Sequence, residues 1–284
     1  MPKTIGNPLT WGAQALFGTA QIAGEAIDGI GGQEAAPPQV HRLAMSDIGT
    51  ALRKGMADAM ASRSDVIFIV LVYPLIGGLL AYMALHRGAL HLVFPLTAGF
   101  ALLGPVSGIA LYDMSRRRES ESDPGWGEVL SDMRTRLIGP ELLLGLVLAA
   151  LFVFWMLAAN AIYAATLGPE APASLASFVS DVLTTSAGWA MILAGCGVGL
   201  GFAAVALVIS VVSFPMLVDR RVGLFGAVVT SARVAASNPG VVAAWGLIIA
   251  ALLALGSIPA FLGLIVVLPV LGHASWHFYR AAVS

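Results

Sequence analysis

Long apolar runs separated by short polar segments set the pattern of this sequence. Several of these runs approach or exceed about 18 residues with few charges, which is the signal of a membrane-crossing helix. We predict crossings over residues 66–85, 90–113, 142–167, 188–214, 241–255 and 259–279. The pattern therefore predicts an all-α integral membrane protein with six transmembrane helices, arranged as three hairpins.

A shorter helix with one apolar side is predicted before each hairpin, over residues 46–63, 126–138 and 222–237. In the first of them the apolar side comprises Ile48, Leu52, Met56, Ala59 and Met60. The joints that follow are alike, because each places an arginine shortly before a helix cap or a proline. Three such units predict a pseudo-threefold repeat, with amphipathic helices around the cytoplasmic side. Chance similarity between apolar sequences is the alternative.

The amino-terminal part, residues 1–45, differs from the six-span membrane domain that we assign to residues 46–284. Residues 1–32 follow helical spacing in part, which predicts an amphipathic helix on the membrane surface or against a partner. A weakly ordered extension is the alternative, and residues 31–41 form a linker. Lys3 is the only early cation and no continuous apolar run follows it, so a secretory signal is not expected.

Composition agrees with a membrane protein and excludes some partners. Hydrophobic residues make up 58% and charged residues 11% of the 284 positions, and the mean hydropathy is +0.87. Soluble domains are about a quarter charged. No basic surface interleaved with aromatic residues stands out, so nucleic acid is not expected as a partner. Cys196 is the only cysteine, so neither an intrachain disulfide nor a cysteine-based metal site is predicted.

The distribution of lysine and arginine predicts the orientation. Residues 1–65 contain five of them, residues 114–140 five, residues 215–240 three and the carboxyl-terminal segment one. The alternate connections contain a single cation, Arg87. Because cytoplasmic loops carry an excess of positive charge, fourteen cations against one place both termini in the cytoplasm of a bacterial inner membrane.

Three segments carry a resemblance to a known family. They are Ser213 to Arg221 (SFPMLVDRR), Ser231 to Ala250 (SARVAASNPGVVAAWGLIIA) and Leu268 to Arg280 (LPVLGHASWHFYR). With them the chain resembles, over about residues 45–282, the bacterial integral membrane proteins of the domain-of-unknown-function 2189 family. The resemblance implies a multi-pass protein for whose family no activity is established. Some members are labelled as similar to cytochrome c oxidase subunit I, but the membrane histidines that a haem–copper site needs are too few here.

Polar and aromatic residues near the cytoplasmic ends of the second, fourth and sixth crossings form the candidate site. We expect an interface cluster of Asp113, Arg116, Asp219, Arg220, His273, Trp276, His277, Tyr279 and Arg280. His273 and His277 lie four residues apart on one helix face, a spacing that can bind a metal or a haem. Interfacial anchoring or hydrogen bonding between helices explains the same pair, so we predict no catalytic residue, cofactor or metal. For Asp219 with Arg220, a local ion pair is the alternative.

Ionisable groups deep in a membrane mark ion or proton paths, and the predicted crossings contain almost none apart from Glu141 and Asp181 near their ends. The sequence therefore favours a non-catalytic accessory, scaffold or assembly component that binds membrane lipids and a larger complex of partner membrane proteins. A small-molecule or lipid transporter is the alternative, because paired prolines and glycines such as Pro269 and Gly272 suit broken helices. A haem- or metal-binding redox subunit is the third hypothesis.

Overall fold

The computed structural model describes residues 38–61, 75–79, 82, 89–100, 102, 104–120, 139–259 and 261–284. The helices predicted over residues 1–32 and 126–138 lie outside the described residues, and so does most of the first crossing, of which residues 75–79 and 82 are helical. The described part is all-helical, apart from one isolated bridge that pairs Val40 with Val283.

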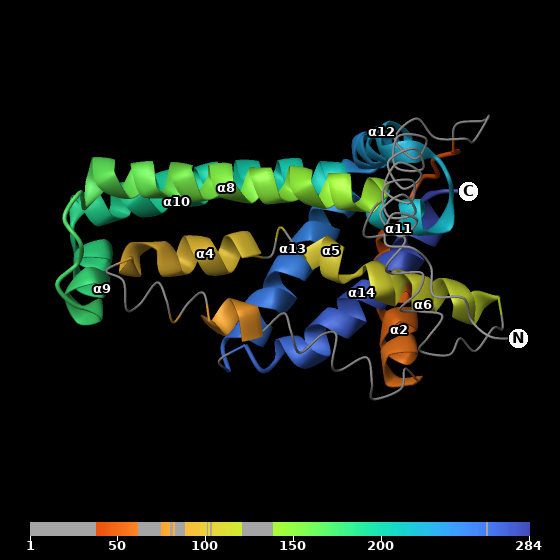
Figure 1. The fold of residues 1–284 in the computed structure, drawn as a ribbon, viewed down its shortest axis with the longest axis horizontal. Helices are drawn as coiled ribbons and strands as arrows, with labels where there is room; N and C mark the ends of the chain where they lie inside the picture. The colour runs from red at the N-terminus through yellow and green to blue at the C-terminus, as the bar shows by residue number, and fades with distance from the viewer. Residues whose placement is uncertain are drawn as a thin grey trace, which may run out of the picture.

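The longest helices form a hairpin. α8 runs over Pro140–Thr166 and α10 over Ser186–Ser210, and α9, Leu175–Thr184, joins them. Pro140 stands in the first turn of α8 together with Glu141, and both residue types favour a helix start. Figure 1 shows α8 and α10 side by side along the longest axis, with α9 at one end. The 27 residues of α8 extend about 40 Å, which exceeds the roughly 30 Å of a bilayer's hydrocarbon core.

Within the described residues, three helical segments have the length and composition of membrane crossings: Pro140–Thr166, Ser186–Asp219 and Pro239–Ser257, the last being α13. They correspond to the predicted third, fourth and fifth crossings, and the start at Pro239 gives the fifth its length. The sixth corresponds to α14, Leu264–Ala282. The second is present as four pieces, η1 (Leu90–Leu92), α4 (Val93–Phe100), α5 (Gly104–Ser107) and α6 (Ile109–Glu119). The count of six, the hairpin arrangement and the threefold repeat stay predictions.

α10 stops before the predicted end of the fourth crossing. It ends at Ser210, and the short helix α11, Ser213–Asp219, follows after a break. The next helix, α12 (Gly223–Ser237), stabilises this break, because Ser231 donates its hydroxyl proton to the carbonyl oxygen of Val208 at 2.7 Å. The break turns α11 into the protein core, where nearly all of its residues are buried.

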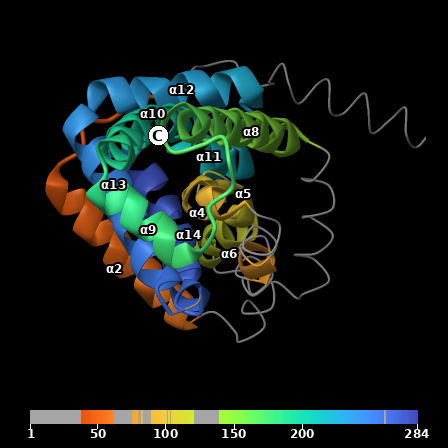
Figure 2. The same ribbon diagram turned by 90° about the vertical axis from the view of Figure 1, so that its left-hand side faces the viewer.

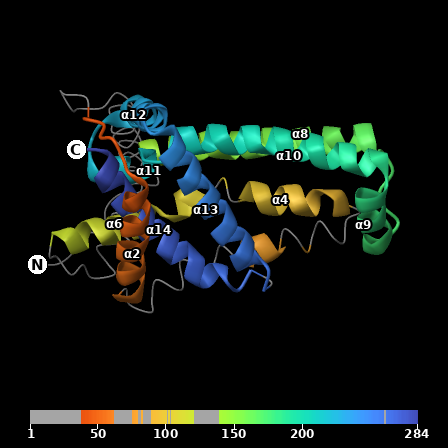
Figure 3. The same ribbon diagram turned by 180° about the vertical axis from the view of Figure 1, so that it is seen from behind.

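α2, Met45–Ala61, packs mainly against α14, from the other end of the sequence. Figures 1 and 3 show the two helices together at the end of the molecule opposite to α9. Their approach is close, since a Cβ added at Gly55 would lie only 2.5 Å from the backbone nitrogen of Ala274. Glycine is therefore required at this crossing point.

The packed side of α2 differs from the predicted apolar side. Ile48, Ala51 and Gly55 are buried, whereas Met56 and Met60 are 44% and 80% exposed. Met56 and Met60 therefore lie off the packed side, and at Gly55 α14 comes so near that a larger side chain would collide with it. Helical spacing predicts an apolar side but does not reveal that the closest contact lies at a glycine.

The molecule has two contrasting ends. We define the collar end as α2, α6, α11, α12 and residues 273–284, which gather opposite to α9 (Figure 1). There α12 lies across α8 and α10 rather than along them (Figure 2). α13 and α14 run obliquely to the long hairpin (Figure 3). Two of the three predicted amphipathic helices, α2 and α12, are thus found together at one end.

Candidate functional site

α14 supplies most of the predicted cluster. His273, Trp276, His277, Tyr279 and Arg280 lie on its last turns, where His273, Trp276 and Tyr279 are at most 1% exposed. The rings of Trp276 and Tyr279 lie 5.6 Å apart. This half of α14 packs on α2 and lies outside the apolar segments that qualify as membrane crossings. One helix therefore supplies five polar or aromatic side chains, of which three are buried, His277 is half-buried and Arg280 is exposed.

A hydrogen-bonded chain links the two histidines through two other helices. Ser115 on α6 donates its hydroxyl proton to Oδ2 of Asp58 on α2, at 2.8 Å. Because that proton is already used, the Ser115 oxygen accepts from Nδ1 of His273, at 2.7 Å. Nε2 of His277 donates to the same Asp58 oxygen at 2.9 Å. The chain His273–Ser115–Asp58–His277 therefore ties α2, α6 and α14 together.

The surroundings of this chain set its protonation. Burial acts to raise the pKa of Asp58, but hydrogen bonds from His277 and Ser115 outweigh it and hold that pKa below its ordinary value. Burial lowers the pKa of His273 to about 4, against the opposing effect of the Asp58 carboxylate. At neutral pH the chain therefore contains an ionised Asp58 and a neutral His273.

Two further carboxylates complete the cluster. Glu119, at the end of α6, accepts from Nε1 of Trp276 at 3.1 Å and lies 3.2 Å from Nε of Arg280. Asp219, at the end of α11, accepts from the hydroxyl of Tyr279 at 2.6 Å and lies 3.5 Å from Nη1 of Arg280. Arg280 thus bridges carboxylates of two different helices.

The remaining predicted residues take part in local ion pairs. Nε of Arg220 lies 3.5 Å from Oδ2 of its neighbour Asp219. Asp113 pairs with Arg116 and Arg117 on its own helix, at 2.6 Å each. The structure therefore brings Asp219 and Arg220 together with the residues of α14, and it places Asp113 and Arg116 in a separate pair on α6. The local pair expected for Asp219 coexists with its bonds to α14.

Residues 93–219 match the sequence model of a family described as "Predicted integral membrane protein (DUF2189)". The match runs from α4 to the end of α11, so it is narrower than the resemblance over residues 45–282 and includes, of the three segments quoted for that resemblance, only residues 213–219. No curated protein and no solved structure matches the chain.

The cluster joins the domain-of-unknown-function 2189 segment to flanking helices. Asp113, Arg116 and Asp219 lie inside the matched residues, whereas α2 and the residues of α14 lie outside them. The side-chain bonds of the cluster therefore connect the recognised segment with a helix before it and a helix after it.

Sequence reasoning missed Asp58, Ser115 and Glu119. Ser115 and Glu119 lie four residues apart and share one face of α6, next to the arginine run, and that spacing is a signal that could have found them. Asp58 gives no such signal, because a carboxylate on an amphipathic helix is ordinarily solvated. Only its packing against α14 reveals its role.

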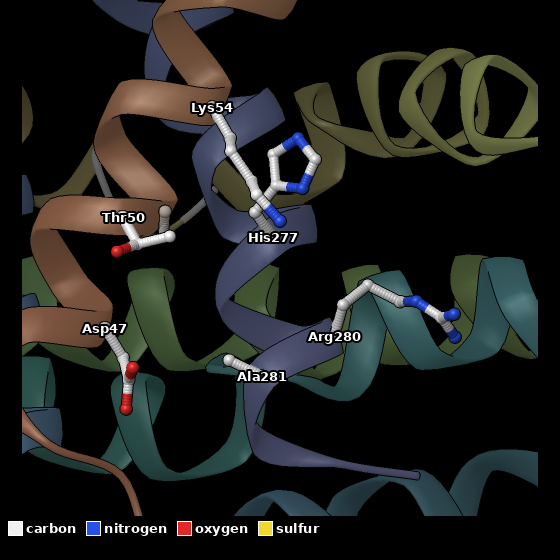
Figure 4. Close-up of a pocket in the computed structure, with 7 residues that line it drawn as sticks. Asp47, Thr50, Lys54, His277, Arg280 and Ala281 are labelled. Atoms are coloured by element: carbon white, nitrogen blue, oxygen red, sulfur yellow. The ribbon is translucent and has the colours of Figure 1, made fainter.

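A cavity of about 150 Å³ lies beside the cluster, between α2 and α14. Its polar lining comprises Asp47, Thr50, Lys54, His277 and Arg280. In Figure 4 the Lys54 amine lies on the α14 side near the His277 ring, whereas the Arg280 guanidinium points away from α2. The cavity is smaller than the pockets of about 300–1,000 Å³ that hold drug-sized ligands. It suits a few solvent molecules or a small polar group.

Proposed function

We propose that this protein is a non-catalytic component of a bacterial inner membrane, an accessory, scaffold or assembly factor that binds lipids and partner membrane proteins. The polar cluster is the observation that carries the proposal. Its carboxylates, Asp58, Glu119 and Asp219, are bound by side chains of other helices, which makes the collar end a rigid base. Such mutual binding suits a structural role, because a catalytic group has to be available to a substrate.

The two histidines support the same interpretation. The Nδ1 of His273 is bound to Ser115, and the Nε2 of His277 is bound to Asp58. Both are hydrogen bonds between helices, and they occupy ring nitrogens that a haem or a metal would need. We therefore keep the redox subunit as the weaker hypothesis.

The charge distribution supports six crossings with both termini in the cytoplasm. The described lysines and arginines belong to the collar end and its immediate flanks, and the connection over residues 168–187 contains Glu170 and Asp181 but no cation. Positive charge gathers on the cytoplasmic side of a membrane.

The long hairpin supplies the surface for lipids or partner helices. Phe154, Leu157, Leu193 and Leu200 are among its exposed apolar side chains. Lipid tails and the apolar faces of other membrane helices both cover such a surface.

Topology fusions test the orientation. Alkaline phosphatase fused after Ser284 is expected to be inactive, and the same enzyme inserted at Glu170 is expected to be active. An active fusion at the carboxyl end would contradict the proposed placement.

Affinity purification in mild detergent with mass spectrometry tests the accessory role. The wild-type protein is expected to retain defined membrane proteins, and the double variant Glu119→Gln, Asp219→Asn is expected to lose them while it still inserts. Asp181→Asn, a carboxylate change at the opposite end, is the matched control. Solute transport by the purified protein alone in liposomes would overturn the accessory role in favour of the transporter.

A further inference from the structure

α12 exposes two large apolar side chains, although its Val234 is buried and its Leu224 and Val228 pack against the core. Its core-facing side includes the small or polar residues Ala227, Thr230 and Ser231, which are buried. Phe225 and Val229, four residues apart, are 71% and 46% exposed on the other side. In surface helices of soluble proteins, the side that faces away from the core is polar. The outer side of α12 therefore requires an apolar environment.

The length and direction of α12 exclude a crossing. Its 15 residues extend about 22 Å, which is less than the roughly 30 Å of a hydrocarbon core. Figure 2 shows that α12 lies across the long hairpin, which has the length to cross. A helix in this position lies in the plane of the membrane surface.

Two arginines lie at or on α12 without an acidic partner among the described residues. No aspartate or glutamate occurs after Asp219 in the sequence. Arg221, before the helix, and Arg233, within it, are exposed, and neither has an acidic partner in the described part of the chain. Arg42 adds a third cation, because its Nη1 donates to the carbonyl oxygen of Ser237 at 2.8 Å. A negatively charged surface would complement these three arginines.

The apolar side of α12 continues an apolar surface of the hairpin. α10 packs against α12, and Val205 and Val208 near its end are exposed. Acyl chains of lipids beside α10 would therefore also contact α12, and lipid phosphates would lie at the level of its arginines. One kind of partner would then contact both the exposed apolar side chains and the arginines.

We propose that α12 is an in-plane helix that binds anionic phospholipids of the cytoplasmic leaflet. Phe225 and Val229 enter the acyl boundary, while Arg221 and Arg233 bind lipid phosphates. This inference rests on the proposed function, since it requires the collar end at the cytoplasmic surface.

Spin-label depth measurements test the position of α12. In a Cys196→Ser background, a nitroxide on Phe225→Cys is compared with one on Thr50→Cys, in vesicles of phosphatidylglycerol and phosphatidylcholine. The label at residue 225 is expected to collide more with oxygen than with a water-soluble nickel chelate. A label on native Cys196, which is exposed on α10, is expected to behave in the same way and is the reference for a lipid-facing position. The label at residue 50 is expected to behave in the opposite way. Access of the chelate to residue 225, or shielding from both reagents by protein, would overturn the inference.

Lipid retention tests the role of the arginines. Native mass spectrometry after reconstitution is expected to show a preference for phosphatidylglycerol over phosphatidylcholine. Arg221→Gln and Arg233→Gln are each expected to reduce this preference about fivefold. Lys54→Gln removes one charge from the same end but on α2, and it is expected to leave the preference unchanged. An equal reduction in all three variants would show a general charge effect and overturn the binding site.

The two proposals fail in different ways. Topology fusions report the side of the membrane, and the nitroxide reports depth. A water-exposed residue 225 with cytoplasmic termini overturns the in-plane helix alone, whereas periplasmic termini overturn the proposed function.

Discussion

The collar end and the long hairpin are held together by different forces. At the collar end, side chains of α2, α6, α11 and α14 bind one another around Asp58, Glu119 and Asp219. In the hairpin, α10 is largely exposed. A side-chain hydrogen bond from α8 to α4 joins Trp155 Nε1 to the carbonyl oxygen of Pro95 at 2.8 Å.

With the collar end in water and the hairpin in lipid, as we propose, the contrast follows from the two solvents. Lipid tails are as apolar as leucine, so helices in a membrane gain little from hiding apolar surface from lipid. In the aqueous layer, burial of apolar surface and hydrogen bonding to charged groups both favour association. The collar end is therefore expected to be the stable part of the isolated protein, and the hairpin the part that depends on its surroundings.

Gly55→Leu is expected to give the largest loss of stability. Its side chain would collide with the backbone of Ala274, and the free energy of unfolding should fall by about 3 kcal/mol. Gly49→Leu on the same helix is the control, because a Cβ there has no atom within 4 Å. Thermal unfolding in detergent measures both variants. Equal melting temperatures would contradict the close approach of α2 and α14.

Asp58→Ala is expected to cost about 2 kcal/mol, because the Ser115 hydroxyl and the His277 ring then lose their shared acceptor. Asp181→Ala on α9 removes a carboxylate from the other end and should change the unfolding free energy much less. A comparable loss in the two variants would remove the distinction between the two ends.

Acid is expected to weaken the collar end before it affects the hairpin. His273 stays neutral in the folded protein down to about pH 4, whereas an unfolded histidine binds a proton near its ordinary pKa of 6.5. The unfolded state therefore binds more protons as the pH falls from about 6.5 to 4, and stability decreases over this range, by about 1 kcal/mol at pH 5.5. His273→Gln should flatten the decline, measured as melting temperature against pH. An unchanged slope would contradict a buried neutral histidine.

Trp155→Phe is expected to have the smallest effect. It removes the bond to Pro95 and leaves an aromatic ring between α8 and α4, so the loss should be about 1 kcal/mol or less. Limited proteolysis of the protein in detergent measures it. A loss as large as that of Asp58→Ala would show that the hairpin depends on specific polar contacts after all.

Apolar length made the long helices predictable from the sequence. Residues 142–167 correspond to α8, and the fifth crossing begins at Pro239 because asparagine and proline mark a helix start. The break after Ser210 was not predictable, since it depends on the bond between Ser231 and Val208. Local patterns predict where helices form, and they do not show which carbonyl groups a distant serine binds.

The candidate site was predictable from the sequence only on α14, where its residues lie close together in the chain. The polar residues of α14 lie within a few turns of each other and attract attention by spacing alone. Asp58 lies more than two hundred positions away in the sequence and binds His277 only because small residues let α2 and α14 meet. Choice of partner helix is a property of packing, and single-sequence periodicity contains little information about it.

The meeting of Gly55 with Ala274 also sets an order of events during biosynthesis. The ribosome makes these two residues 219 positions apart, which at about 5–20 residues per second is a delay of roughly 10–40 seconds. During that interval α2 is part of the nascent chain, but α14, against which it packs, has not yet been made. α14 therefore stabilises a helix made much earlier, and a chain that stops short of α14 leaves the contact surface of α2 uncovered for quality-control proteases.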